Sequence, residues 1–332
     1  MSESDSGQAG NHRIAIEVLM NDGMNNVADS NLVRTQTART NGFVVHANGD
    51  GGPRPPLSPD QPDPFDDELS AERLADCGTI RLPRSDEKSL LVMQYKPAMQ
   101  SALEAYRTLR TRLERRQAGK GMRSLVISSA AQGEGKTLTT FNLALCYAKM
   151  QNFPVLMVDA DLRSQGLSQL MGDPQSPGLG TVLEERCDYA SAILATDSPG
   201  LYALPAGSST TSPPELLARP GWKVFIAWAT ETFRLVIVDS PPVLNVADFE
   251  LVMAPCDSVI LVVRSRKTGA GYLTRVLAES DPNKLAGVVF NATEERTVSY
   301  YPYGSRRDRG APKNSPQGSA GEEIVAQAPG SE

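Results

Sequence analysis

The stretch SLVISSAAQGEGKT, residues 124–137, decides the fold of this chain. It begins with an apolar run typical of a strand, continues with a glycine-rich segment and leads into a helical pattern. From position 130 it matches GxxxxGK[ST], with Ala130 where glycine is usual. Backbone N–H groups of such a turn and the N-terminus of the following helix point at one place, so the stretch predicts a phosphate-binding loop in an α/β domain.

The side chains of this loop indicate the ligand. Gly133 and Gly135 allow backbone N–H groups to crowd around phosphate oxygens. Lys136 is expected to reach the β and γ phosphates, and Thr137 is expected to supply a hydroxyl to Mg²⁺. The expected ligands are therefore a nucleoside triphosphate and Mg²⁺.

Apolar runs alternate with helical patterns through the middle of the chain. Strands are expected at 124–129, 155–160, 201–206, 235–240, 258–263 and 286–291. Helices are expected at 97–117, 136–151, 213–230 and 269–279. Near-continuous apolar strands in βαβ order predict a mostly parallel, buried central sheet in a three-layer α/β/α P-loop NTPase fold.

Acidic residues stand at the ends of two of these strands. Asp159 and Asp161 follow one apolar run, and Asp239 ends another. Ligands of open α/β sheets bind at the carboxyl ends of the strands. An aspartate at such a place can also simply cap the next helix or turn. Because Asp159 and Asp161 would repel each other without a cation, the pair favours a metal site.

The ends of the chain have a different composition from the middle. Residues 1–90 include a proline-rich, acidic stretch and are expected to be a largely disordered extension. Residues 305–332 lack apolar periodicity and are expected to form a disordered tail. The folded domain is therefore expected within 91–304.

Charge and cysteine content exclude some classes of protein. The net charge of −6 argues against a protein that coats nucleic acid. The four cysteines lack metal-site spacing and indicate reduced thiols. Because no run approaches the roughly 18 apolar residues that span a bilayer, the expected location is the cytoplasm.

A series of short motifs, taken together, resembles one known family. They are EAYRTLRTRL (104–113), SSAAQGEGKT (128–137), VDADLR (158–163), SPPELL (212–217), LVIVDSPPVLNVAD (235–248), DSVILVVRSRKT (257–268), KLAGVVFNAT (284–293) and SYYPY (299–303). In order and spacing they resemble the bacterial tyrosine kinases (BY-kinases) of capsule and exopolysaccharide export. The likeness runs from about Pro97 to Gly304.

The resemblance implies an ATP- and Mg²⁺-dependent protein-tyrosine autokinase with a modified P-loop ATPase domain. The implied catalytic residues are Lys136, Asp159 and Asp161, and the implied metal ligands are Thr137, Asp159 and Asp239. The implied nucleotide contacts are Gly133, Glu134, Gly135, Lys136, Thr137, Leu138 and Asn291.

Two further sites are implied by the same resemblance. Tyr300, Tyr301 and Tyr303 would accept phosphate from a neighbouring subunit of a homo-oligomeric ring. The alternative for such a cluster is an aromatic edge strand. Glu104, Arg107 and Arg110 match the family's subunit-contact motif, and the alternative there is a solvated helix face.

The resemblance also implies partners. They are a membrane-embedded polysaccharide co-polymerase or chain-length determinant protein that activates the kinase and recruits it to the inner face of the membrane, and a phosphotyrosine phosphatase. Two other functions stay open, an ATPase switch of the Min/Par type and an ATP-binding scaffold without catalysis. Min/Par switches usually carry an extra lysine early in the loop, where this chain has Ala130, Ala131 and Gln132.

Overall fold

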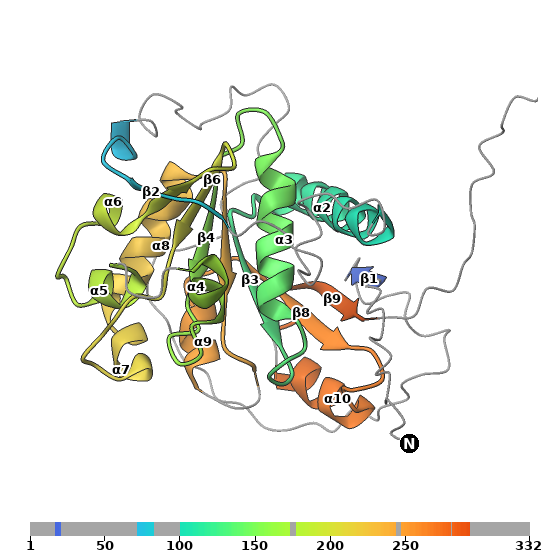
Figure 1. The fold of residues 1–332 in the computed structure, drawn as a ribbon. Helices are drawn as coiled ribbons and strands as arrows, with labels where there is room; N and C mark the ends of the chain where they lie inside the picture. The colour runs from blue at the N-terminus through green and yellow to red at the C-terminus, as the bar shows by residue number, and fades with distance from the viewer. Residues whose placement is uncertain are drawn as a thin grey trace, which may run out of the picture. The chain divides into compact units, whose positions relative to one another are not determined.

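One sheet of nine strands runs through the centre of the protein (Figure 1). In this computed structural model the described residues are 17–20, 72–82, 100–172, 177–243, 247–279 and 281–292. The strands are β1 (Glu17–Met20), β2 (Gly78–Ile80), β3 (Ser124–Ser129), β4 (Val155–Asp159), β5 (Leu194–Thr196), β6 (Leu201–Leu204), β7 (Leu235–Asp239), β8 (Ser258–Arg264) and β9 (Leu285–Asn291). Their order is β1-β9-β8-β3-β7-β4-β6-β5-β2.

The sheet is mostly parallel, as predicted. All strands from β9 to β6 in this order pair in parallel, and so do β2 and β5. The antiparallel pairs are β1 with β9 and β5 with β6. Every residue of β3, β4 and β7 is buried, which explains why their sequences are apolar without alternation.

Helices cover both faces of the sheet (Figure 1). They are α2 (Gln100–Lys120), α3 (Lys136–Ala148), α4 (Gly166–Met171), α5 (Leu179–Leu183), α6 (Tyr189–Ala192), α7 (Pro213–Leu217), α8 (Pro220–Thr232), α9 (Asp248–Met253) and α10 (Ala270–Glu279). Leu125 and Ile127 of β3 pack into the core with α2 and α3. Val126, between them, packs into the core with α8 and α9. The predicted three-layer α/β/α fold is confirmed.

The structure adds elements that the sequence did not predict. The short strands β1 and β2 are the two edge strands of the sheet, and the short strand β5 lies between β2 and β6. Two of them come from residues 1–90, which were expected to be largely disordered. The single helix expected at 213–230 was wrong, because Pro220 ends one helix and begins another. The division of the chain into 1–90, 91–304 and 305–332 stays a prediction.

No helix in the described ranges has the length and apolar character needed to cross a bilayer. The four cysteines are free thiols, and Cys146 and Cys256 are buried in the core.

Candidate active site

The phosphate loop joins β3 to α3 and is shaped by two glycines. Gly133 and Gly135 have φ angles of 80° and 98°, in the left-handed region that favours glycine. A Cβ atom at Gly135 would lie 2.0 Å from Nδ2 of Asn291. Both the backbone angle and the space at Gly135 therefore require glycine.

Replacing Gly135 by alanine is expected to lower the free energy of unfolding by about 3 kcal/mol and to abolish MgATP binding, because strain and clash act together. Chemical denaturation and calorimetric titration measure the two effects. Gly172 is the matched control, because its φ of 80° is also in the left-handed region but a Cβ there would meet nothing within 4 Å. Gly172→Ala is expected to cost about 1 kcal/mol. An equal loss in both variants would contradict the role of the clash.

Three of the expected nucleotide contacts have side chains that face the protein. The Glu134 carboxylate is buried and accepts hydrogen bonds from Ala131 N, at 3.0 Å, and from the Thr268 hydroxyl. Asn291 Nδ2 donates to Glu134 O at 2.9 Å. The Leu138 side chain packs against the core between the sheet and α2. These side chains support the shape of the loop.

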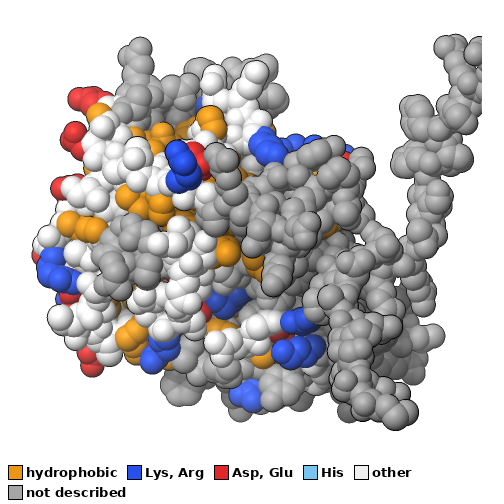
Figure 2. All heavy atoms as spheres, in the orientation of Figure 1, with side chains coloured by type: hydrophobic (Ala, Val, Ile, Leu, Met, Phe, Trp, Pro, Cys, Tyr) orange, Lys and Arg blue, Asp and Glu red, His pale blue; other side chains and the backbone are white. Residues whose placement is uncertain are grey.

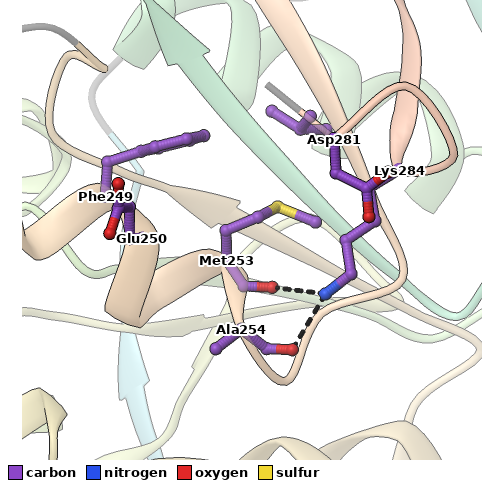
Figure 3. A pocket seen from close by; sticks show the side chains of 7 residues that line it. Phe249, Glu250, Met253, Ala254, Asp281 and Lys284 are labelled. Carbon is purple, nitrogen blue, oxygen red and sulfur yellow. Dashed lines mark hydrogen bonds between the residues drawn. The ribbon is translucent and has the colours of Figure 1, made fainter. Parts of the chain in front are cut away.

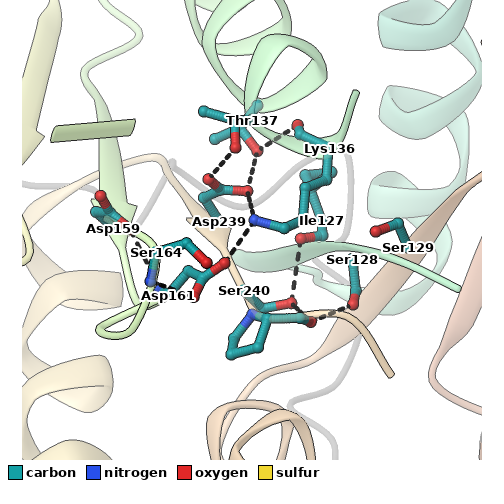
Figure 4. A network of polar contacts seen from close by, with 12 residues as sticks. Ile127, Ser128, Ser129, Lys136, Thr137, Asp159, Asp161, Ser164, Asp239 and Ser240 are labelled. Carbon is teal, nitrogen blue, oxygen red and sulfur yellow. Dashed lines mark hydrogen bonds and ion pairs between the residues drawn. The ribbon is translucent and has the colours of Figure 1, made fainter. Parts of the chain in front are cut away.

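Lys136 is the cation at the centre of the candidate site (Figure 4). Its ammonium lies 2.8 Å from Asp161 Oδ2 and 3.7 Å from Asp239 Oδ1. Burial by itself would lower the pKa of Lys136, but the charges of Asp239 and Asp161 outweigh burial and raise the pKa. Lys136 is therefore charged and held between the ends of β4 and β7.

Asp239 and Thr137 meet on the other side of this lysine. The Thr137 hydroxyl donates to Asp239 Oδ2 at 2.7 Å. Burial raises the pKa of Asp239 to about 7, although the charge of Lys136 acts in the opposite direction. A hydroxyl at the first turn of α3 and a carboxylate at the end of β7 are thus brought together.

Asp159 and Asp161 have different surroundings, although Asp159 ends β4 and Asp161 follows it by two residues. Asp159 Oδ2 accepts hydrogen bonds from Ser168 N at 2.8 Å and Ser168 Oγ at 2.7 Å. Asp161 N donates to Asp159 Oδ1 at 3.2 Å, and Ser164 N donates to Asp161 Oδ1 at 3.1 Å. Burial raises the pKa of Asp159 to about 6. Asp161 thus contacts Lys136, while Asp159 is hydrogen-bonded to Ser168 of α4.

These residues fit Mg²⁺ bound with a triphosphate. Asp159, Asp161 and Asp239 are at most 1% exposed, and Lys136 alone among these four residues is a cation. Two or three buried carboxylates against one ammonium leave a deficit of positive charge. In the described residues no group of three or more His, Cys, Asp or Glu side chains is arranged to hold a metal ion by itself. Mg²⁺ needs none, because it binds one or two carboxylates together with substrate phosphates.

A second ion pair joins the loops after β4 and β7. Arg163 Nε donates to Asp248 Oδ2 at 2.7 Å, and Nη2 donates to Oδ1 at 3.3 Å. Asp248 is buried at the start of α9. Sequence reasoning assigned no role to Asp248, Ser168 or Thr268. Asp248 and Thr268 have partners 85 and 134 residues away, and Ser168 reaches Asp159 only because the chain turns back into α4. Local patterns carry no signal for such contacts.

The three expected subunit-contact residues on α2 do not share one environment. Arg107 and Glu104 form an exposed ion pair, with side chains that are 50% and 56% exposed. Arg110 is 24% exposed, donates to Cys146 O at 2.9 Å and pairs with Glu114 at 3.3 Å. Glu104 and Arg107 are therefore open to a partner, whereas Arg110 is bound to its own chain. The expected phosphoacceptors Tyr300, Tyr301 and Tyr303 lie outside the described residues.

A cavity of about 230 Å³ lies apart from these residues (Figure 3). Phe249, Met253 and Val259 supply its apolar lining. Lys284 Nζ donates to Met253 O at 3.1 Å and to Ala254 O at 2.9 Å, so this lysine caps α9. The cavity is at the amino-terminal ends of β8 and β9, whereas the carboxylates of the candidate site follow the carboxyl ends of their strands.

Several known proteins are similar to this chain. Residues 122–279 match a family model described as an AAA domain. The chain is 32% identical over 225 residues to the tyrosine-protein kinase YwqD of Bacillus subtilis, covering 67% of this chain and 93% of that protein. It is 29% identical over 205 residues to the tyrosine-protein kinase wzc of Salmonella typhi, and it spans 28% of that longer protein. The solved kinase domain of the Escherichia coli tyrosine kinase ETK is 26% identical, with a TM-score of 0.59, over 72% of this chain and 99% of that domain.

Proposed function

Since this chain belongs to the bacterial tyrosine-protein kinases and is a protein-tyrosine kinase, we propose that it phosphorylates its own tyrosines Tyr300, Tyr301 and Tyr303 with ATP. One observation supports the chemistry above all others. The buried Lys136 lies between Asp161 and Asp239 at the end of a phosphate loop. A loop of this kind with acidic strand ends is suited to phosphoryl transfer, in which charge stabilisation and positioning do most of the work.

Each residue of the site has one role in the proposed reaction. Lys136 neutralises charge on the γ-phosphoryl group as the bond to the bridging oxygen of ADP breaks. Thr137 and Asp239 would hold Mg²⁺, which screens the phosphate charges when it is bound. The tyrosine oxygen forms the new bond to phosphorus, and its proton passes to Asp161. Asp159, held by Ser168, positions the Asp161 turn through its contact with Asp161 N.

Incubation of the purified protein with MgATP, followed by mass spectrometry of phosphotyrosine, tests this function. The expected result is phosphate on at least one of Tyr300, Tyr301 and Tyr303. The same experiment is run with and without the cytoplasmic segment of a membrane-embedded polysaccharide co-polymerase, which is expected to raise the yield. ATP hydrolysis without phosphotyrosine would favour a Min/Par-type switch, and ATP binding without turnover would favour a scaffold.

The location and partners in the cell are further parts of the proposal. The resemblance of the motif series supports a role in capsule or exopolysaccharide synthesis and export. It also supports recruitment to the inner face of the membrane by the co-polymerase and removal of the phosphate by a phosphotyrosine phosphatase. Binding of the purified chain to vesicles with and without the reconstituted co-polymerase tests the recruitment, and equal binding to both would contradict it.

We further propose that Glu104 and Arg107 contact a neighbouring copy in a ring. Arg107→Glu is expected to shift the protein to monomer in sedimentation velocity, because it removes an exposed cation from the contact. Arg112→Glu is the matched control, since Arg112 is also exposed and lies about 140° around α2 from Arg107. Arg110 is left unchanged because its replacement would break contacts within the chain.

A charge swap separates the contact between subunits from the ion pair within the helix. The double variant Glu104→Arg, Arg107→Glu keeps an ion pair on α2 but reverses its polarity. It is expected to be monomeric and to melt no lower than Arg107→Glu, because it keeps the ion pair within α2 and differs from the unchanged protein in losing the ring. A ring that survives Arg107→Glu would rule out this contact.

A further inference from the structure

The turn between β8 and α10, residues 264–269, is hydrogen-bonded to the phosphate loop. Arg264 Nη1 donates to Gly133 O at 3.3 Å. The Thr268 hydroxyl donates to the Glu134 carboxylate and accepts from Arg264 N at 3.0 Å. Contacts to two successive residues of the loop, together with a bond inside the turn, fix the position of the turn.

Lys267 stands in this turn with its ammonium beside the loop. A Cβ atom built on Gly133 would lie 3.8 Å from Lys267 Nζ. In the described part of the chain no carboxylate pairs with Lys267. The nearby Glu134 carboxylate already accepts bonds from Ala131 N and Thr268. Lys267 is therefore an exposed cation placed against a phosphate loop without a counter-ion of its own.

The expected ligand, a triphosphate, would bring negative charge next to Lys267. Lys136 is engaged by Asp161 and Asp239, so its charge is shared with two carboxylates. The first three residues of the loop pattern, Ala130, Ala131 and Gln132, carry no positive charge. A triphosphate held by the backbone of this loop would bring several negative oxygens next to Gly133. Figure 2 shows Lys and Arg side chains in the region of α10 on this face of the protein.

We propose that Lys267 is a further substrate-binding residue that contacts the phosphates of ATP from outside the loop. This proposal rests on the proposed function, because it assumes that the loop binds ATP. Lys136 is the cation of the loop itself, and Lys267 would supply a second cation from the turn after β8. The Arg264 and Thr268 contacts would position the turn, and Lys267 would touch the ligand.

Calorimetric titration of the full chain with MgATP tests the proposal. Lys267→Gln is expected to weaken binding about tenfold, the usual size of a lost charged contact. Lys267→Arg keeps the charge and is expected to bind within about threefold of the unchanged protein. Lys223→Gln, at an exposed lysine of α8, is the matched control and is expected to bind like the unchanged protein. Thermal melting of each variant checks the fold.

The dependence on salt identifies the cause of any loss. Between 50 and 500 mM salt the difference between Lys267→Gln and the unchanged protein is expected to shrink to about threefold or less, because salt screens an exposed charge. Unchanged affinity in Lys267→Gln, or a loss that does not respond to salt, would overturn the proposal. Absence of MgATP binding by the unchanged protein would instead overturn the proposed function. Normal binding by both proteins would leave the proposed function standing and remove the role of Lys267.

Discussion

Replacing Lys136 by methionine is expected to lower the rate of phosphotyrosine formation at least about a thousandfold, equivalent to about 4 kcal/mol of transition-state stabilisation. The substitution keeps an unbranched side chain but removes the cation between Asp161 and Asp239. The transferring phosphoryl group would then face carboxylates without a compensating charge. Initial rates of phosphate incorporation from labelled ATP measure the effect. A rate within tenfold of the unchanged protein would contradict the role of Lys136.

The stability of this variant needs its own control, because Lys136 also balances buried charge. Asp239 has a pKa of about 7, above its ordinary value of 3.8. Between pH 3.8 and about pH 7, Asp239 is therefore protonated in the folded state and ionised in the unfolded state. The stability of the ligand-free protein consequently falls as pH rises through this window. Lys136→Met is expected to lose less stability at pH 6 than at pH 8. Melting curves at both pH values separate misfolding from lost chemistry, and Lys223→Met serves as the surface control.

The sequence predicted the centre of the fold because it depends on local patterns, and the same patterns pointed to residues that the structure brings together beside the phosphate loop. The phosphate loop is contiguous, and the apolar runs of β3, β4 and β7 reflect burial on both faces. The strands β1, β2 and β5 have only three or four residues, too few for a pattern to stand out. Their pairing is decided by neighbouring strands rather than by propensity.

The arrangement of the site could not be predicted in the same way. Asp159 and Asp161 share a strand end, and nothing local tells which of them turns toward Lys136. Ser168 decides this, since its N–H and hydroxyl hold the Asp159 carboxylate. On α2, helical periodicity placed Arg110 on the charged side. The structure shows that its long side chain reaches back to Cys146 O at the end of α3.

The two carboxylates after β4 are expected to respond differently to replacement by the isosteric amide. Asp161→Asn is expected to lower the rate of phosphotyrosine formation about a thousandfold, because it removes the proposed proton acceptor beside Lys136. Its effect on KM for ATP is expected to stay within about threefold, since proton transfer contributes only in the transition state. Asp159→Asn is expected to cost about tenfold, because the turn is still formed but less well held. Steady-state kinetics with both variants measure the contrast.

Ser168→Ala distinguishes positioning from chemistry at Asp159. The Ser168 hydroxyl donates to Asp159 at 2.7 Å and accepts from Ala206 N at 2.8 Å, so it acts on the proposed reaction through Asp159. If Asp159 acts by holding the turn, Ser168→Ala and Asp159→Asn overlap, and the double variant loses less than the product of the two single losses. A larger loss in Asp159→Asn than in Asp161→Asn, with independent effects of Ser168→Ala, would instead make Asp159 the proton acceptor. The position of Asp161 beside Lys136 favours the first outcome, because the group that takes the proton must lie where the phosphoryl group is held.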